Sequence, residues 1–372
     1  MADNAVKPTK IILLTGYLGA GKTTLLNHLL ANQRGIRAAV IVNDIGEVNV
    51  DASLVRDGGL AEDIIPLTNG CICCTLSEDL AEQLSGIAQS GEFDYIVIEA
   101  SGICEPIPIA YTISGFCDAS QEGASPLALD NIVCVVDCAR MYDEFNGGRA
   151  LVSGDVDEDD VESLLIQQIE FCTTLILNKT DKVTPAQIAE LRAIVRSLQK
   201  DARIVEAQRG EVAMEELVNT GRFDFMDAYN SAVWADAMDH PEEHEDPEVL
   251  EYGFSTFVYD RRRKIDLEAL GELANHWPEG IVRAKGVIWA AQDPDERYLF
   301  EQAGREISAM GTGPFVAAMP EEQRAAEFAA DPTLAAYWDP ELGDRGTRLC
   351  IIGRHMDRAA VEAALDACLA ED

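Results

Sequence analysis

The feature that most constrains this chain is a glycine-rich octapeptide near its N-terminus, Gly16–Thr23, with the sequence GYLGAGKT. It satisfies the spacing G-x-x-x-x-G-K-[ST] of a phosphate-binding loop. The apolar run before it (10–15) is typical of a buried strand, and the segment after it (23–32) has helical periodicity. In this context backbone N–H groups can surround phosphate oxygens at the positive end of a helix dipole. The chain is therefore predicted to bind a nucleotide.

The residues of this loop have separate expected roles. Nucleotide contacts are expected from six of them: Gly19, Ala20, Gly21, Lys22, Thr23 and Thr24. The Lys22 ammonium is predicted to reach the β- and γ-phosphates, and the Thr23 hydroxyl to coordinate Mg²⁺. A glycine-rich turn without a ligand is the alternative, but the strand and helix on either side argue against it.

Apolar runs alternate with helical patterns over residues 1–225. Four further runs are predicted strands: 37–44, 94–102, 130–137 and 173–181. Helical stretches between them include 76–89 and 184–200. Strands that are apolar throughout and alternate with helices indicate a parallel sheet buried on both faces. The predicted fold class is therefore α/β, a P-loop NTPase sheet with helices on both faces, in a domain spanning residues 1–225.

The tetrapeptide Asn178–Asp181, NKTD, follows one of these strands and predicts which base is bound. A carboxylate at Asp181 can accept hydrogen bonds from N1 and the exocyclic amine of guanine, whereas adenine offers no matching donors. Asn178 and Lys179 are expected to complete the base site. The Ala207 N–H, at the end of the apolar segment RIVEA, is expected to bond guanine O6. The predicted cofactor is thus GTP, not ATP.

The segment Glu99–Gly102, EASG, closes another predicted strand. A carboxylate here can hold Mg²⁺ through water, so Glu99 joins Lys22 and Thr23 as a catalytic candidate. The Gly102 N–H is expected to sense the γ-phosphate. A plain strand-terminal turn is the alternative. The sequence identifies neither a catalytic base nor an arginine finger.

Three of the ten cysteines lie within four residues: Cys71, Cys73 and Cys74. Thiolates so placed can present two or three sulfurs to one ion, and they suit Zn²⁺, Cu⁺ or Co²⁺, not Mg²⁺. Buried thiols or a redox pair are the alternatives. Cys104 is close enough in sequence to join them, although a core position is expected. Four cysteines in apolar runs are predicted core residues: Cys134, Cys172, Cys350 and Cys368.

Five motifs occur along the chain in a characteristic order: GYLGAGKTT, NDIGEVNVD, GCICC, EASG and QIEFCTTLILNKTD. Two more follow near the C-terminus, VRAKGVIW and RLCIIG. In content and order the chain resembles the CobW-type metallochaperones, a subfamily of P-loop GTPases that serve metalloenzyme assembly. The resemblance implies GTP hydrolysis coupled to delivery of a transition metal to a client metalloprotein.

The resemblance also implies a set of metal ligands. The ion would be bound chiefly by Cys73 with Cys71 or Cys74, and Glu47 of NDIGEVNVD would be a further ligand or coupling residue. Zinc is expected first, with cobalt and iron as alternatives. Many zinc-delivering members of the group carry a histidine-rich tract before the C-terminal domain, whereas here that region holds only His240 and His244.

Residues 226–250 are predicted to form an acidic linker, because the stretch 236–251 carries eight acidic residues, two prolines and no Lys or Arg. Beyond it, strands are predicted at 252–259, 281–291, 298–310 and 348–353, and helices at 266–277 and 357–370. This order indicates a smaller α+β domain with a split βαβ core over residues 251–372, similar to the CobW C-terminal domain. Its basic run Arg261–Lys264 is either a client-docking site or a solvated strand end.

A net charge of −37 argues against broad nucleic-acid binding. No segment is long and apolar enough to span a membrane, and the N-terminus shows no apolar signal region, so a cytoplasmic protein without a membrane partner is expected. The expected partners are GTP and a client metalloprotein, and a homodimer is compatible with the sequence.

Three other functions fit the same motifs. The chain could be a GTP switch without metal, or an activator of one metalloenzyme such as a nitrile hydratase or a cobalamin-pathway enzyme. It could also be a redox-sensing GTPase in which oxidation of the clustered thiols controls hydrolysis. Only the functions that involve a metal predict thiolate-to-metal coordination.

Overall fold

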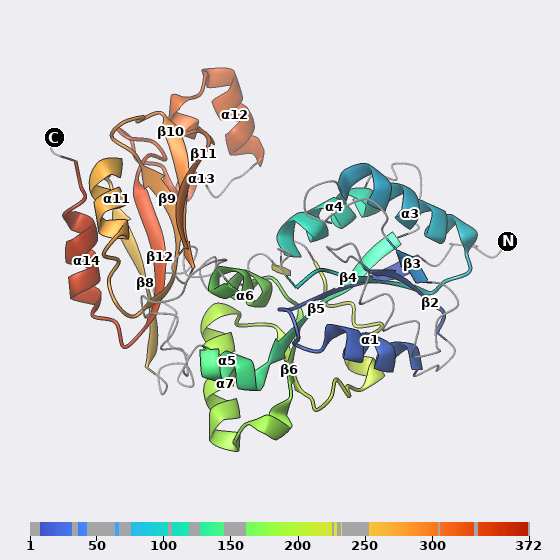
Figure 1. The fold of residues 1–372 in the computed structure, drawn as a ribbon. Coiled ribbons are helices and arrows are strands. Elements are labelled where there is room, and N and C mark those ends of the chain that lie inside the picture. Colours follow the sequence, from blue (N-terminus) through green and yellow to red (C-terminus); the bar gives the residue numbers. More distant parts are fainter. Residues whose placement is uncertain are drawn as a thin grey trace. The chain divides into compact units, whose positions relative to one another are not determined.

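The computed structural model describes residues 8–31, 36–42, 64–66, 76–102, 106–118, 127–144, 161–224, 227–228, 232, 253–303, 306–330 and 334–370. They form two compact units, and each unit is built around one β-sheet (Figure 1). The expected metal ligands Glu47, Cys71, Cys73 and Cys74 lie outside the described residues, as do Cys104 and the acidic stretch 236–251.

The first unit contains a seven-stranded sheet in the order β3-β2-β4-β1-β5-β6-β7. Every neighbouring pair is parallel. The strands are β1 (Thr9–Thr15), β2 (Ala38–Val42), β3 (Ile64–Pro66), β4 (Tyr95–Glu99), β5 (Leu127–Asp137), β6 (Thr174–Asn178) and β7 (Arg203–Glu206). All five strands predicted from apolar runs in this domain are present, and the short strands β3 and β7 are additions to them.

Helices cover both faces of this sheet, which confirms the predicted α/β class. They are α1 (Lys22–Ala31), α3 (Leu76–Ser90), α4 (Pro106–Asp118), α5 (Cys138–Glu144), α6 (Val161–Glu170) and α7 (Pro185–Leu198), with the 3-10 turns η3 (Thr180–Lys182) and η4 (Met214–Glu216). Helices α3 and α4 lie on the face opposite α1 (Figure 1). Under α1, Leu25 and Leu29 share one core with Val40, Val97 and Val133 of the strands.

The segment that follows β7 crosses the face covered by α1. Met214, Leu217 and Val218 belong to the same buried core as α1. The segment leaves β7 at the carboxyl edge of the sheet and thus returns towards the amino edge. Ala232 then forms an isolated antiparallel bridge with Gln199, beyond the predicted end of the domain at residue 225.

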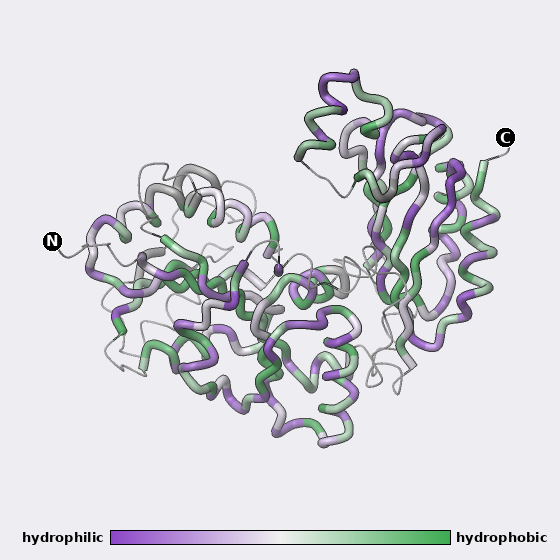
Figure 2. Tube along the Cα trace, turned by 180° about the vertical axis from the view of Figure 1, so that it is seen from behind, coloured by the Kyte–Doolittle hydropathy of each residue, from purple (hydrophilic) through white to green (hydrophobic). Residues whose placement is uncertain are grey.

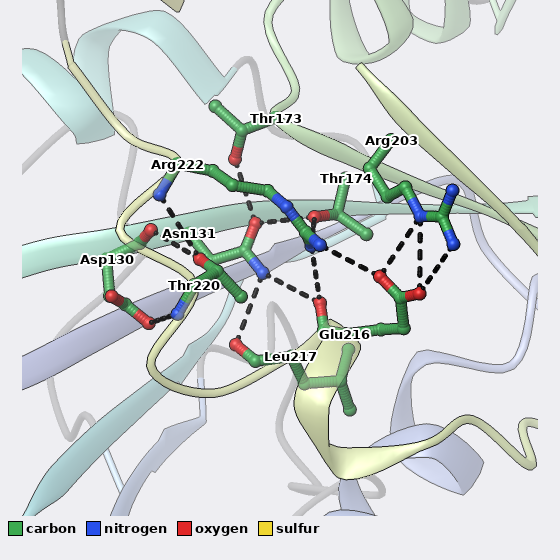
Figure 3. Close-up of polar contacts among 9 residues, drawn as sticks. All are labelled: Asp130, Asn131, Thr173, Thr174, Arg203, Glu216, Leu217, Thr220 and Arg222. Atoms are coloured by element: carbon green, nitrogen blue, oxygen red, sulfur yellow. Dashed lines mark hydrogen bonds and ion pairs between the residues drawn. The ribbon is translucent and has the colours of Figure 1, made fainter.

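A buried polar network holds the end of this segment near the amino-terminal ends of β5 and β6 (Figure 3). The Asp130 carboxylate accepts the N–H groups of Thr220 and Gly221 at 3.1 and 2.9 Å. The Asn131 amide donates to the Leu217 carbonyl and accepts the Thr174 hydroxyl. Asp130 and Asn131 are almost fully buried, so their bonds to backbone satisfy groups that would otherwise be costly to bury.

The second unit is built on an antiparallel sheet in the order β11-β10-β9-β12-β8. Its strands are β8 (Phe254–Arg261), β9 (Ile281–Trp289), β10 (Glu296–Ala303), β11 (Glu306–Pro314) and β12 (Thr347–Arg354). Strands β8 and β9 both run antiparallel to β12, which lies between them, so the predicted split βαβ core is present. The stretch 298–310, predicted as strand, forms parts of two strands, because β10 and β11 pair as a hairpin with Ala303 opposite Glu306.

Helices α11 (Leu267–Ala274) and α14 (Arg358–Asp366) pack on one face of this sheet, where Leu270 and Leu365 join the strand residues Tyr259 and Ile351 in one core. The remaining elements are η5 (Val316–Ala318), α12 (Glu321–Ala330) and α13 (Leu334–Tyr337). Hydrophobic residues follow the strands of both sheets (Figure 2). Among the described residues no helix has the length and apolar character needed to cross a membrane.

The basic run Arg261–Lys264 is engaged within the second unit. The Arg261 guanidinium pairs with Asp366 at 2.9 Å, and Arg262 and Arg263 donate to backbone carbonyls. The Lys264 ammonium lies 5.3 Å from the centre of the Trp289 ring. These contacts favour the second alternative given above, a strand-end cluster, over a client-docking site.

Candidate functional site

The phosphate-binding loop lies between the end of β1 and the start of α1, as predicted. Gly16, Gly19 and Gly21 have φ values of 130°, 77° and 108°, a region that L-amino acids with a side chain rarely adopt. A Cβ atom on Gly16 would lie 2.2 Å from the Val135 carbonyl oxygen, and one on Gly21 would lie 2.4 Å from Asn178 Nδ2. Backbone conformation and close packing therefore both require glycine at the first and last of these positions.

Side chains bind five successive carbonyl oxygens of this loop. Lys22 Nζ donates to Gly16 and Tyr17 at 2.6 and 3.4 Å. The other three bonds are Arg140 Nη1 to Leu18 at 3.0 Å, Lys179 Nζ to Gly19 at 2.8 Å and Asn178 Nδ2 to Ala20 at 2.9 Å. Since the N–H and C=O of a peptide point in opposite directions, donors on the carbonyl side leave the N–H side of the loop for an anion. The exception is the Ala20 N–H, a predicted nucleotide contact, which donates to the Tyr17 carbonyl at 3.1 Å in this structure.

Thr23 and Glu99 are brought together by the pairing of β1 with β4. The Thr23 hydroxyl donates to Glu99 Oε1 at 3.0 Å, and the Glu99 side chain is 1% exposed. A hydroxyl and a carboxylate oxygen in contact are the hard donors that Mg²⁺ prefers, so these two residues fit the predicted magnesium site. Gly102 lies against the loop as well, because a Cβ atom there would be 2.6 Å from the Leu18 nitrogen.

Two residues of the NKTD tetrapeptide, Asn178 and Lys179, bind the phosphate loop, whereas Asp181 does not. Asn178 is 1% exposed and bridges two loops, since its Oδ1 accepts the Gly210 N–H at 2.9 Å while its Nδ2 holds the Ala20 carbonyl. It is placed to position these loops and not to face a base. Asp181 is exposed in the first turn of η3. Lys179 adopts a left-handed conformation, with φ 61°, and its ammonium pairs with Asp137.

The Ala207 N–H, which was expected to bond guanine O6, has a partner within the sheet. It donates to the Leu177 carbonyl at 2.8 Å, which continues the pairing of β6 with β7. The Ala207 carbonyl accepts both the N–H and the hydroxyl of Thr180. The donor that the sequence assigned to guanine O6 is therefore already occupied. Gln208 and Arg209, the next two residues, are exposed.

Two residues of this site were missed by sequence reasoning, Asp137 and Arg140. Asp137 ends β5 and its Oδ1 accepts the N–H groups of Ala139 and Arg140, so it caps α5 while its other oxygen pairs with Lys179. An acidic residue between an apolar strand and a helix is a recognisable capping pattern. No local pattern indicates Arg140, because its partner Leu18 lies 122 residues away in sequence.

Five of the described thiols are core residues. The predicted core positions Cys134, Cys172, Cys350 and Cys368 are all buried, and so is Cys138. Burial raises the pKa of the Cys134 and Cys138 thiols to about 12, and that of Cys172 well above its usual value. Among the described residues no group of three or more His, Cys, Asp or Glu side chains could hold a metal ion.

We expect iodoacetamide at neutral pH to leave Cys134, Cys138 and Cys172 unmodified in the folded protein, because the reactive thiolate is scarce and buried. Peptide mass spectrometry before and after addition of denaturant measures this directly. Cys117, which is partly exposed, serves as the internal comparison. Labelling of the three buried thiols at the rate seen in denaturant would contradict the packing described here.

Comparison with protein families gives two matches. Residues 10–206 match the family described as CobW/HypB/UreG, nucleotide-binding domain. Residues 254–369 match the cobalamin synthesis protein CobW C-terminal domain. The two matched regions correspond to the two sheets described above.

Individual curated proteins are similar over almost the whole chain. Zinc-regulated GTPase metalloprotein activator 1 of Dictyostelium discoideum is 32% identical, with 97% of this chain and 80% of that protein covered. Zinc chaperone CobW of a Sinorhizobium species is 31% identical over 95% of this chain and 96% of that protein. Zinc chaperone YjiA of Escherichia coli is 28% identical over 82% of this chain and 89% of that protein.

Proposed function

Because the chain belongs to the CobW/HypB/UreG family of nucleotide-binding proteins, we propose that it is a GTP-hydrolysing metallochaperone that binds zinc and transfers it to a client protein. Cobalt and iron are the alternative cargoes. The observation that carries the nucleotide part is the phosphate loop, whose five carbonyl oxygens are held by side chains on the side away from its N–H groups. The names of the similar proteins support the metal part.

In the proposed reaction the loop N–H groups bind the β- and γ-phosphates, and the Lys22 ammonium exchanges its bonds to the Gly16 and Tyr17 carbonyls for bonds to these phosphates. Thr23 and Glu99 would hold Mg²⁺, which neutralises charge that develops on the phosphates when it is bound. Asp181 recognises the guanine edge, and we reassign the contact with O6 from the Ala207 N–H to the backbone N–H groups of Gln208 and Arg209, two exposed residues. Gly102, packed on the Leu18 backbone, is placed to respond to the γ-phosphate.

The sheet register supports a link between the nucleotide and the proposed C-x-C-C metal site. Val42 of β2 lies opposite both Pro66 of β3 and Glu99 of β4. At the usual strand spacing Pro66 is roughly 10 Å from Glu99 along the carboxyl edge of the sheet. Cys71, Cys73 and Cys74 follow Pro66 in the sequence, and Glu47 follows β2. We propose that a ligand at Glu99 and a metal held by these residues influence each other.

Such coupling is reciprocal: metal should tighten GTP binding by the same factor by which GTP tightens metal binding. We propose that GTP favours the metal-binding geometry and that hydrolysis favours transfer of the ion to the client. A general chaperone and an activator of one metalloenzyme share this chemistry and differ in the client. The activator remains a candidate because one similar protein is named as a metalloprotein activator.

A Co²⁺ titration of the reduced protein tests this proposal. We expect an intense thiolate-to-cobalt charge-transfer band that strengthens with Mg²⁺ and a slowly hydrolysed GTP analogue, and that Zn²⁺ abolishes. Substitutions Cys71→Ser, Cys73→Ser and Cys74→Ser should weaken Co²⁺ binding, at least tenfold for Cys73, whereas Cys117→Ser is the matched control and should not. GTP turnover without a band in any condition would leave a GTP switch and exclude the chaperone.

A further inference from the structure

Arg140 makes two contacts with the crest of the phosphate loop, which we define as Tyr17 and Leu18. Its guanidinium carbon lies 4.3 Å from the centre of the Tyr17 ring, and its Nη1 donates to the Leu18 carbonyl at 3.0 Å. A guanidinium can make both contacts at once, because its flat face stacks on the ring while its N–H groups point outwards in the plane. An ammonium group offers no such face.

The position of Arg140 is itself fixed by the base-recognition side of the site. Its backbone N–H donates to Asp137 Oδ1 at 3.2 Å, in the first turn of α5. The other Asp137 oxygen pairs with Lys179, whose ammonium also holds the Gly19 carbonyl at 2.8 Å. Arg140 and Lys179 therefore grip adjacent carbonyls of the loop, and one carboxylate connects them.

The Leu18 backbone is held on a second side as well. A Cβ atom on Gly102 would lie 2.6 Å from the Leu18 nitrogen and 2.9 Å from its Cα, so Gly102 packs directly on this residue. The crest is thus enclosed between α5 and the turn after β4. The Leu18 side chain itself is 63% exposed, so its own packing contributes little to holding the crest.

We infer that Arg140 is a positioning residue for nucleotide binding, which holds the crest of the phosphate loop with its carbonyl turned outwards so that the loop N–H groups converge on the phosphates. It acts on the carbonyl side of the loop, and so differs from an arginine finger that touches the transferred phosphoryl group. Because the loop grips the nucleotide before and during the reaction, loss of Arg140 should weaken binding more than it slows the chemical step.

The test compares Arg140→Ala and Arg140→Lys with the unmodified full chain. Dissociation constants for GDP and a GTP analogue, turnover at saturating GTP and the melting temperature are measured for each. Arg140→Ala should weaken both nucleotides about tenfold, as expected for one charge-assisted hydrogen bond, with turnover reduced less than about threefold. Arg140→Lys should recover only part of the loss.

The matched control is Arg37→Ala, since Arg37 is exposed at the start of β2 and donates to the Gly91 carbonyl at the opposite edge of the sheet. Millimolar guanidinium should restore nucleotide affinity to Arg140→Ala, a response that a general loss of stability would not show. Affinity within twofold of the unmodified protein in Arg140→Ala would overturn the inference, as would an equal loss in Arg37→Ala. Should Arg140→Ala fail to fold, full affinity in Arg140→Lys would overturn it.

The inference rests on the GTP binding proposed above, and the two can fail separately. If the unmodified protein bound and hydrolysed no GTP, the proposed function itself would fall. If it did both and the Arg140 variants were unaffected, only the positioning role would fall.

Discussion

Replacing Asp181 with Asn is expected to weaken GTP binding about 1,000-fold and to transfer the preference to xanthosine triphosphate. The carboxylate is exposed in the first turn of η3, and it can accept from both N1 and the exocyclic amine of guanine. An amide in its place sets a donor against that amine, and a site built for such bonds rejects an unmatched partner strongly. Xanthine carries a carbonyl at this position, which the amide can bond.

Dissociation constants for GTP, ATP and xanthosine triphosphate measure this change. The control is Asp201→Asn, because Asp201 is exposed at the turn before β7, away from the phosphate loop. GTP affinity within tenfold of the unmodified protein, without a gain for xanthosine triphosphate, would mean that another residue selects the base.

The substitution Glu99→Gln is expected to lower GTP turnover about 100-fold and to raise the Mg²⁺ concentration needed for half-maximal rate. The amide oxygen can still accept the Thr23 hydroxyl, which lies 3.0 Å from Glu99 Oε1, so the fold of this corner is retained. What is lost is the negative charge in a buried position, where it favours the bound cation most.

Turnover measured across a Mg²⁺ titration separates a metal effect from a folding effect, since excess Mg²⁺ should recover part of the rate. Glu92→Gln is the control, because Glu92 is exposed in the turn before β4. If Glu99→Gln kept the full rate at limiting Mg²⁺, Glu99 would have a structural role and no role in binding Mg²⁺.

Much of the nucleotide-binding unit could be predicted because its determinants are local. The three glycines of Gly16–Thr23 permit the positive φ values that the loop adopts. Apolar runs of strand length alternate with helical patterns, and this alternation is typical of a parallel sheet. The acceptor geometry of Asp181 likewise follows from chemistry within one tetrapeptide.

In the second unit, local sequence patterns predict strand character and charge but not the boundaries of strands or the partners of charged groups. Residues 298–310 have strand character throughout, yet they contribute to both β10 and β11. The basic run Arg261–Lys264 offers charge for a partner, whereas the fold uses Arg261 to bind Asp366, 105 residues later in sequence. Composition predicts exposure of such a run but not which groups lie beside it.

Local sequence features were thus enough to predict where phosphates and base would bind, because glycine conformation, strand periodicity and carboxylate chemistry act within a few residues. Which distant groups surround that loop depends instead on the tertiary fold. The strand order places β4 and β5 on the two sides of β1, and so brings Glu99 to Thr23 and Arg140 to Leu18. It also engages the Ala207 N–H with Leu177 and turns Asn178 towards Ala20. Hydrogen-bond partners are chosen by proximity in space, and strand order sets that proximity without leaving a local pattern in the sequence.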